Sequence, residues 1–444
     1  MRRIILGGLL VAGLQPIGSG AGQQEDRTAP LLAKAQTVVD LMAARDFAKT
    51  IDLFDAVMKG ALPEDKLQAA WDAVVQQAGA FKERGRVSSQ PRGNLLITRV
   101  TCQFEKMNLD VQVVFDKDGL VAGLSFAPVA EAWSPPPYAA AGTFTESDLT
   151  VGAEHWPLPG TLTMPAGAGP FPAVVLVHGS GPEDRDETYG PNKTFKDLAV
   201  GLAARGIAVL RYEKRTQQYA GSLGGLANFT VKDETIDDAV AAVAALRRQP
   251  KIDPARIFVL GHSLGGTLLP RIAAADPKIA GLISLAGSTR KLGDAMLAQV
   301  TYLVTAAGPI TPDGQKQLDD TKKLVARVEA LTPADAGNPQ SIGGAPATYW
   351  LDLNGYDAVA AAKAIPQRML FLQGERDYQV TMADDFAAWK AGLAGQSRVT
   401  FRSYPALNHL FLPGTGKSLP AEYNNPGHVP EDVIRDIAEW IGAR

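Results

Sequence analysis

The sequence predicts an α/β protein in which a small α+β domain precedes a larger domain with a mostly parallel central sheet. Three observations predict this division. From about residue 144 onward, short apolar runs typical of buried strands alternate with helical patterns, as in a parallel sheet covered on both faces. Before that point helices come first and strands follow them. A proline-rich stretch separates the two patterns and marks a domain boundary.

The composition is that of an ordinary globular protein. The 444 residues are 46% hydrophobic and 20% charged, and the formal net charge is −3. No basic field for nucleic acid and no polybasic block for anionic lipid follows from this balance. The single cysteine, Cys102, excludes an intramolecular disulfide framework, and five histidines leave little room for a metal centre. We therefore expect no cofactor, no metal and no nucleic-acid partner.

The first 21 residues predict a signal peptide. Arg2 and Arg3 form a short positive region, residues 4–14 are an apolar run, and small residues follow at 18–22. The run is too short to span a bilayer as a mature helix, and no cysteine follows it as a lipid attachment point. We expect an exported protein, periplasmic or secreted, with no stable membrane anchoring.

Residues 27–128 predict the small α+β domain. Apolar residues recur first at helical spacing and then at the spacing of strands. The predicted helices are 30–44, one capped by Asp46 that runs to Val57, and one that begins at Pro63; the predicted strands are 95–97, 111–115 and 121–126, with a hairpin turn at 116–119. Residues 129–143 are predicted to be a stiff Pro/Ala-rich linker.

Residues 144–444 predict the large domain. Its predicted strands are 173–177, 207–210, 257–260, 279–286, 369–372 and 399–403, and its predicted helices are 195–205, 230–248, 264–275, 381–391 and 430–440. The 82 residues between Ala286 and Met369 exceed what one crossover needs. We predict a helical cap over about 288–365, with helices at 295–306, 315–331 and 358–364; the alternative is a surface excursion.

Residues 261–266 (GHSLGG) are the most informative segment. They match the G-x-S-x-G nucleophile elbow, in which a sharp strand-to-helix turn lifts a serine hydroxyl above the sheet edge. A predicted strand precedes this segment and a predicted helix follows it, as the elbow requires. The glycines suit the turn because a Cβ there would clash. Ser263 is therefore the candidate nucleophile.

A serine nucleophile needs a base, and in proteins with this elbow the basic histidine comes after the serine, late in the chain. Downstream of Ser263 the histidines are His409 and His428. His409 comes just after the last predicted strand, where a loop can carry an imidazole over the sheet. His428 lies beside the start of the final helix, where a surface cap explains it. His409 is the preferred base.

The orienting acid is expected after the preceding strand, 369–372. Asp377 occupies this loop, and Glu375 is its nearest rival. Asp384 and Asp385 fall within the following predicted helix and are expected to be solvated surface residues.

An oxyanion hole needs two backbone N–H donors. One comes from the residue after the nucleophile, Leu264, and the other from the loop after an early strand, where Ser180 is the candidate. His178, in the same loop, is interpreted as a ring that braces the turn. His262 neighbours the nucleophile and is expected to point away from it.

Several motifs together resemble one family. They are 178–182 (HGSGP), 184–186 (DRD), 211–215 (RYEKR), 261–266, 349–353 (YWLDL) and 374–377 (GERD). On these motifs, residues 157–444 resemble the bacterial α/β-hydrolase esterases of the dienelactone-hydrolase-like branch, with serine in place of that enzyme's cysteine. The resemblance implies an α/β-hydrolase fold and carboxylester hydrolysis through Ser263, Asp377 and His409. Residues 27–128 resemble a small domain of nuclear-transport-factor-2-like appearance.

The expected function is that of an exported serine carboxylesterase acting on small or medium acyl esters. The alternatives are a serine peptidase or thioesterase with the same triad and, from another class, a non-catalytic binding module. Tyr349 and Trp350, late in the predicted cap, are expected to be buried and to form the apolar wall of the acyl pocket. The alternative is that they anchor the cap to the main domain.

Overall fold

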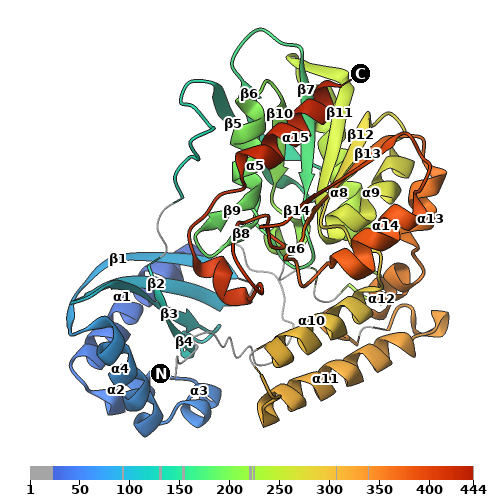
Figure 1. Ribbon diagram of the computed structural model, residues 1–444. Coiled ribbons are helices and arrows are strands. Elements are labelled where there is room, and N and C mark those ends of the chain that lie inside the picture. Colours follow the sequence, from blue (N-terminus) through green and yellow to red (C-terminus); the bar gives the residue numbers. More distant parts are fainter. Residues whose placement is uncertain are drawn as a thin grey trace. The chain divides into compact units, whose positions relative to one another are not determined.

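The computed structural model describes residues 24–92, 95–129, 133–152, 156–219, 223, 226–306, 308–338 and 340–443. The expected signal peptide, residues 1–21, lies outside the described residues. The chain divides into two compact units, residues 1–130 and 131–444 (Figure 1). No helix in the described part of the chain has the length and apolar character needed to cross a membrane.

In its described residues, the first unit has a four-stranded antiparallel sheet in the order β1-β2-β3-β4 and four helices. Its elements are α1 (Gln24–Ala43), α2 (Phe47–Asp52), α3 (Ala56–Ala61), α4 (Glu64–Ala78), β1 (Phe81–Arg92), β2 (Leu95–Phe104), β3 (Asn108–Phe115) and β4 (Val121–Pro128). The predicted helix from Asp46 to Val57 is wrong in extent. Asp46 does cap α2, but α2 ends at Asp52 and Asp55 caps the separate helix α3.

Aromatic residues fill the core of the first unit. Trp71 packs against Phe81, Phe104 and Phe126, with ring centroids between 5.8 and 6.2 Å apart. Cys102 is fully buried in the same core, and burial raises the pKa of its thiol to about 12.

The second unit has an eight-stranded sheet in the order β14-β13-β12-β11-β7-β10-β6-β5. Its strands are β5 (Phe144–Val151), β6 (Leu158–Pro165), β7 (Phe171–Val177), β10 (Ala208–Tyr212), β11 (Ile252–His262), β12 (Gly281–Leu285), β13 (Arg368–Gly374) and β14 (Val399–Tyr404). Neighbouring strands pair in parallel from β14 to β10, whereas β6 and β5 join antiparallel at one edge. The mostly parallel sheet is therefore confirmed. A short hairpin, β8 (Thr188–Tyr189) and β9 (Asn192–Lys193), stands apart.

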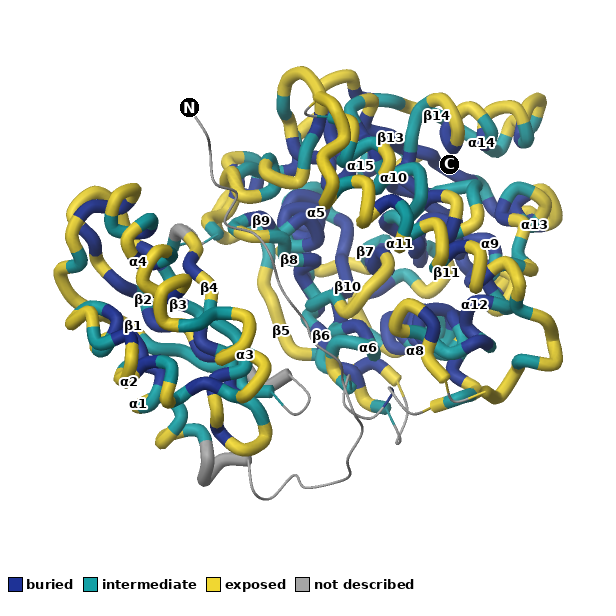
Figure 2. The backbone as a smooth tube through the Cα atoms, turned by 90° about the horizontal axis from the view of Figure 1, so that it is seen from below, coloured by how far each residue is buried: buried dark blue, intermediate teal, exposed yellow. Residues whose placement is uncertain are grey.

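Helices cover both faces of this sheet. Along β7, Val175 faces a core shared with α8 (Asp237–Arg247) and α9 (Leu264–Ala275), while Leu176 faces a core shared with α5 (Thr194–Ala203) and α15 (Glu431–Gly442). Both residues are fully buried, as in a strand of a doubly covered sheet. The buried backbone is concentrated in the strands and in the inner sides of these helices (Figure 2).

A helical insertion lies between β12 and β13. It contains α10 (Leu292–Ala306), α11 (Pro312–Glu329), α12 (Ala347–Asn354) and α13 (Ala358–Ala364), and α10 packs along α11 (Figure 1). Helices α10, α11 and α13 were predicted from the sequence, whereas α12 was not.

Two predicted helices begin with a π-helical turn. Lys232–Ile236 precedes α8, and Met382–Phe386 precedes α14 (Ala387–Gly392). At the first of them, the N–H and hydroxyl of Thr230 both donate to Asp233, as in a capping box.

Candidate active site

Ser263 lies at a strained turn between β11 and α9. Its φ is 50°, in the left-handed region that a residue with a side chain seldom adopts. Its N–H donates to the carbonyl of Leu285 at the end of β12, over 2.9 Å. The serine therefore stands at the carboxyl edge of the parallel strands, which is the geometry of a nucleophile elbow.

The glycines around Ser263 allow backbone segments to touch. A Cβ on Gly261 would lie 2.3 Å from the carbonyl carbon of Gly265, and a Cβ on Gly265 would lie 2.4 Å from the carbonyl oxygen of Val177. Real side chains do not make such contacts, so both positions require glycine. The start of α9 consequently lies directly against the end of β7.

Asp377 and His409 meet at the ends of the two neighbouring strands β13 and β14. His409 Nδ1 lies 2.7 Å from Asp377 Oδ2, and both side chains are buried. The other oxygen of Asp377 accepts the N–H groups of Gln379 and Val380. Gln373 adds a third donor, from its side-chain amide to Oδ2 over 3.1 Å. The carboxylate is thus held on both oxygens while it binds the imidazole.

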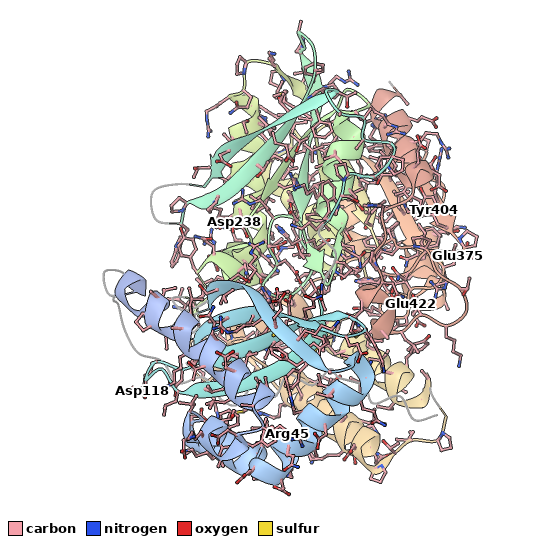
Figure 3. The ribbon with its side chains drawn as sticks, turned by 90° about the vertical axis from the view of Figure 1, so that its left-hand side faces the viewer. Arg45, Asp118, Asp238, Glu375, Tyr404 and Glu422 are labelled. Carbon is pink, nitrogen blue, oxygen red and sulfur yellow. The ribbon has the colours of Figure 1, made fainter. Side chains whose placement is uncertain are left out.

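The rivals lie elsewhere. Glu375 is exposed and accepts a hydrogen bond from the hydroxyl of Ser403, on the outside of the second unit (Figure 3). His428 is not a simple surface cap, because its Nδ1 contacts the buried carboxylate of Asp197 at 3.0 Å. Neither residue contacts Asp377 or His409 through a hydrogen bond in the part of the chain that the structure describes.

The surface assignment of Asp385 is wrong, although Asp384 is exposed as expected. Asp385 is fully buried, and its carboxylate forms an ion pair with Arg290 at 2.6 Å. It also accepts hydrogen bonds from the backbone of Thr289 and the hydroxyl of Ser288. Arg290 and these donors outweigh the effect of burial and lower the pKa of Asp385. Asp385 therefore holds residues 288–290, at the start of the insertion, in place.

The loop after β7 approaches Ser263 closely. A Cβ on Gly179 would lie 3.3 Å from Ser263 Cβ. The N–H of Gly179 donates to Glu187, so it is not a free donor. Among the described residues, the N–H of Ser180 has no hydrogen-bond partner. Leu264 is the first residue of α9, where the backbone N–H has no partner within the helix.

His262, the residue before Ser263, is buried among hydrogen-bond acceptors. Its Nδ1 lies 3.0 Å from Glu187 Oε1 and its Nε2 lies 2.9 Å from the backbone carbonyl of His409. Both partners accept, so both ring nitrogens must carry protons and the ring is an imidazolium. Burial lowers its pKa, but the carboxylate of Glu187 outweighs burial and raises the pKa overall. Sequence reasoning missed Glu187, because nothing in residues 184–188 indicates burial.

His178 supports the turn after β7, as predicted from the sequence. Its Nε2 donates to the carbonyl of Asp184 over 3.0 Å, and its ring packs against Phe195 and Tyr212. Burial lowers its pKa to about 4, so the ring is neutral near pH 7.

The structure separates the two neighbouring aromatics of α12. Tyr349 packs in a cluster with Leu264, the residue after Ser263, and Leu268. Trp350 packs in another cluster with Val328 and Ile342, within the insertion, and its Nε1–H donates to the carbonyl of Ile342. The position of Trp350 favours an anchoring role over a pocket wall, whereas Tyr349 borders the residues at the elbow.

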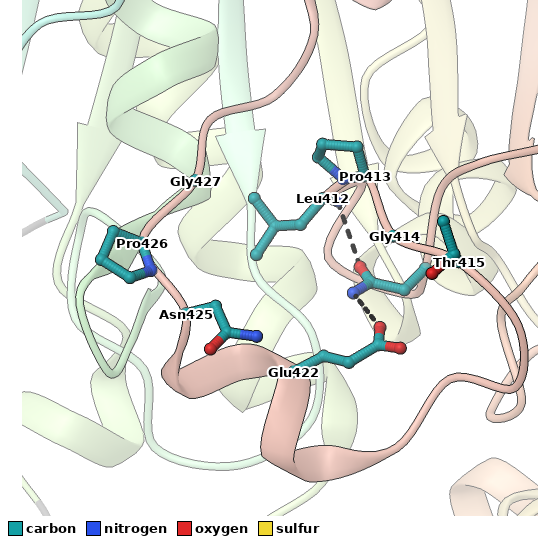
Figure 4. Close-up of a pocket in the computed structure, with 9 residues that line it drawn as sticks. Leu412, Pro413, Gly414, Thr415, Glu422, Asn425, Pro426 and Gly427 are labelled. Carbon is teal, nitrogen blue, oxygen red and sulfur yellow. Dashed lines mark hydrogen bonds between the residues drawn. The ribbon is translucent and has the colours of Figure 1, made fainter.

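A cavity of about 320 Å³ lies in the loops that follow His409 (Figure 4). It is lined by Asn408, residues 412–415, Glu422 and residues 425–427. Asn408 donates to Glu422 and also accepts the N–H of Leu412, so the cavity walls fix the loop next to His409. Among the described residues, no three His, Cys, Asp or Glu side chains gather as metal ligands would.

Comparison with known proteins identifies the relatives of this chain. The family described as serine aminopeptidase, S33 matches residues 169–414, and a family of unknown function matches residues 35–124. Esterase EstD of Thermotoga maritima is 37% identical over 404 residues, which cover 91% of this chain and 93% of that protein. The match therefore extends through both units.

Two of the solved structures that align with this chain show its low sequence identity to them. An esterase of Pyrococcus furiosus aligns with a TM-score of 0.42 and 16% identity over 70% of this chain and 97% of its own. A dienelactone hydrolase of Anabaena variabilis aligns with a TM-score of 0.40 and 17% identity over 68% and 98%. Because one family covers more than half of the sequence and the match to EstD runs through both units, the chain belongs to the serine aminopeptidase S33 family of α/β hydrolases.

Proposed function

We propose that this protein is a serine carboxylesterase that hydrolyses small or medium acyl esters through Ser263, His409 and Asp377. The observation that carries the proposal is the buried hydrogen bond between Asp377 and His409, at the same sheet edge as the strained turn of Ser263. The relative that matches both units is named an esterase, which supports ester substrates for this chain.

In the first half-reaction, His409 Nε2 removes the hydroxyl proton of Ser263 as its oxygen attacks the ester carbonyl. Asp377 accepts the Nδ1–H of His409 and stabilises the imidazolium that forms. The N–H groups of Leu264 and Ser180 stabilise the negative oxygen of the tetrahedral intermediate. His409 then returns the proton to the leaving alcohol, and an acyl-enzyme on Ser263 remains.

In the second half-reaction, water replaces the alcohol. His409 removes a proton from this water, which attacks the acyl carbonyl through a second tetrahedral intermediate held by the same N–H groups. The proton passes from His409 back to the Ser263 oxygen as the carboxylic acid leaves. No group outside these residues and water is needed to balance either step.

A serine peptidase is the second candidate, because the family that matches residues 169–414 is described as a serine aminopeptidase. A triad alone does not decide the leaving group. Initial rates on p-nitrophenyl esters, peptide anilides and acyl thioesters, measured side by side with wild type and Ser263→Ala, separate the candidates. We expect Ser263-dependent turnover of the esters to be fastest; faster turnover of the anilides or thioesters would replace the proposal. No Ser263-dependent turnover at all would favour a binding module.

We also propose that the protein is exported and loses residues 1–21. The positive start, apolar run and small residues of this segment support the proposal. Expression of the full chain in a bacterial host, followed by fractionation and intact mass of the protein, tests it. The expected product is a processed protein in the periplasm or medium; an unprocessed chain in the cytoplasm would contradict export.

A further inference from the structure

A buried lysine touches the loop expected to form the oxyanion hole. The ammonium group of Lys214, which lies after β10, donates to the carbonyl oxygen of Gly179 over 2.7 Å. The Lys214 side chain is only 3% exposed. Burying an ammonium group is costly unless it is paired, so its placement at this carbonyl requires an explanation.

The carbonyl of Gly179 and the N–H of Ser180 belong to one peptide group. This group is planar, and its C=O and N–H point in opposite directions. A cation that binds the oxygen therefore fixes the direction of the N–H, and it also draws electron density from the nitrogen, which strengthens that N–H as a donor. Meanwhile the N–H of Gly179 is held by Glu187, so the peptides on both sides of Gly179 are fixed.

Lys214 is in turn held by residues near the insertion. Glu234 Oε1 lies 3.1 Å from the ammonium nitrogen of Lys214, and Glu234 Oε2 accepts the hydroxyl of Tyr349 over 2.7 Å. Glu234 and Tyr349 are both buried. A continuous set of polar contacts thus leads from α12 of the insertion, through Glu234 and Lys214, to the peptide that carries the Ser180 N–H.

We infer that Lys214 is a positioning residue for the oxyanion hole: it orients and polarises the Gly179–Ser180 peptide, while Glu234, itself bound by Tyr349, holds the ammonium group in place. The inference rests on the proposed function, because it assigns to the Ser180 N–H the developing oxyanion. It adds a residue that touches neither the substrate nor Ser263 but decides how well the intermediate is stabilised.

The test compares Lys214→Met with wild type on p-nitrophenyl acetate. We expect kcat to fall by about 10²-fold, the loss seen when one oxyanion donor is removed. KM should change little, because the hydrogen bond from the Ser180 N–H to the substrate oxygen strengthens only in the transition state. The inhibition constant of a trifluoromethyl ketone, whose adduct with Ser263 carries an oxyanion, should weaken by a comparable factor.

Arg215→Met is the matched control. Arg215 is the next residue and forms its own ion pair with the buried Asp238, without contacting the loop after β7. Its replacement likewise leaves a buried carboxylate without its cation, so we expect a comparable loss of Tm with kcat and ketone affinity close to wild type. A fall in kcat as large as that of Lys214→Met would show a general effect of lost ion pairs and would overturn the inference.

The double variant Lys214→Met/Glu234→Gln covers the case in which Lys214→Met folds poorly. It removes the carboxylate charge that the single variant leaves unpaired, so Tm should recover toward wild type. We expect kcat to stay low, because no cation binds the Gly179 carbonyl. Recovery of kcat together with Tm would show that Lys214 serves only to neutralise Glu234, and would overturn the inference.

The outcome for wild type distinguishes this inference from the proposed function. If wild type shows no Ser263-dependent ester hydrolysis, the proposed function fails and the inference falls with it. If wild type hydrolyses esters through Ser263 but folded Lys214→Met keeps its kcat and its affinity for the ketone, only the role of Lys214 is rejected.

Discussion

His262 holds His409 through the main chain: the Nε2–H of His262 donates to the backbone carbonyl of His409 over 2.9 Å. The two rings lie with centroids 4.7 Å apart, yet His262 has no free nitrogen, because Nδ1 is bound to Glu187. His262, which precedes the proposed nucleophile Ser263, therefore supports the loop of the proposed base. With both ring nitrogens protonated, the ring of His262 cannot accept a further proton.

This imidazolium makes stability depend on pH. The pKa of His262 is raised above its ordinary value of 6.5, so its contribution to stability is complete below pH 6.5 and is lost as pH rises through the raised pKa. The pKa of Glu187 is lowered below 4.5, so its contribution is lost only as pH falls through that lowered value. We expect the Tm difference between wild type and His262→Gln to be largest between pH 4.5 and 6.5.

Thermal unfolding of both proteins from pH 4.5 to 9 measures that difference. It should shrink steadily at alkaline pH, where wild type loses the proton that the variant never bound. A difference that stays constant over the whole range would show that folding does not raise the pKa of His262, and would contradict the imidazolium.

Ser263→Ala and His409→Ala should each lower kcat by roughly 10⁴ to 10⁶, because either change removes the activated nucleophile. The double variant should be little worse than either single variant, since the two side chains act as one unit. Steady-state rates on one ester with all four proteins decide the matter. Losses that multiply in the double variant would remove one of the two residues from the proposed triad.

The two acidic candidates predict opposite results. Asp377→Asn should reduce kcat by about 10⁴, because the amide favours the wrong tautomer of His409. Glu375→Gln should have little effect, since Glu375 is exposed and bound to Ser403. Rates of both variants on the same ester provide the comparison, and a severe loss in Glu375→Gln alone would move the acid to that residue.

Asp385→Asn should loosen the start of the insertion. The change leaves the guanidinium of Arg290 without its buried carboxylate partner, and loss of one member of such a pair costs about 3 kcal/mol. Hydrogen exchange over 288–306 should accelerate in the variant, with exchange in β11 as the internal reference. Unchanged exchange at 288–290 would show that other contacts hold this segment.

Trp350→Ala should destabilise without changing substrate preference. The ring lies inside the insertion with Val328 and Ile342, so its removal should cost about 3 kcal/mol. The ratio of rates on short and medium acyl esters should stay that of wild type, because the cluster around Leu264 contains Tyr349 instead. A changed ratio with unchanged Tm would restore Trp350 as a pocket wall.

Local patterns were sufficient for much of the fold and for the position of the candidate triad. The elbow at Ser263 follows from a motif within six residues, and Asp377 and His409 follow from their places after adjacent strands. Strand β1 was missed because it lies at the edge of its sheet, where most of its described side chains are exposed or half-buried and show no apolar alternation.

The supporting charges were not predictable in the same way. Glu187 is buried because it meets His262, which is 75 positions away, and Asp385 is buried because it meets Ser288, 97 positions away. A carboxylate looks like a surface residue in a sequence until its distant partner is known. The same holds for Lys214, whose sequence neighbours give no sign that it binds the carbonyl of Gly179.

The fully buried Cys102, with a thiol pKa of about 12, leaves the protein nearly inert toward thiol reagents. Residues 131–444 contain no cysteine. A cysteine introduced at exposed Thr301 of α10 would therefore be the one readily labelled thiol in the native protein. A fluorophore or spin label there would report on the insertion without any prior removal of native cysteines, so the wild-type background can serve directly for spectroscopy during turnover.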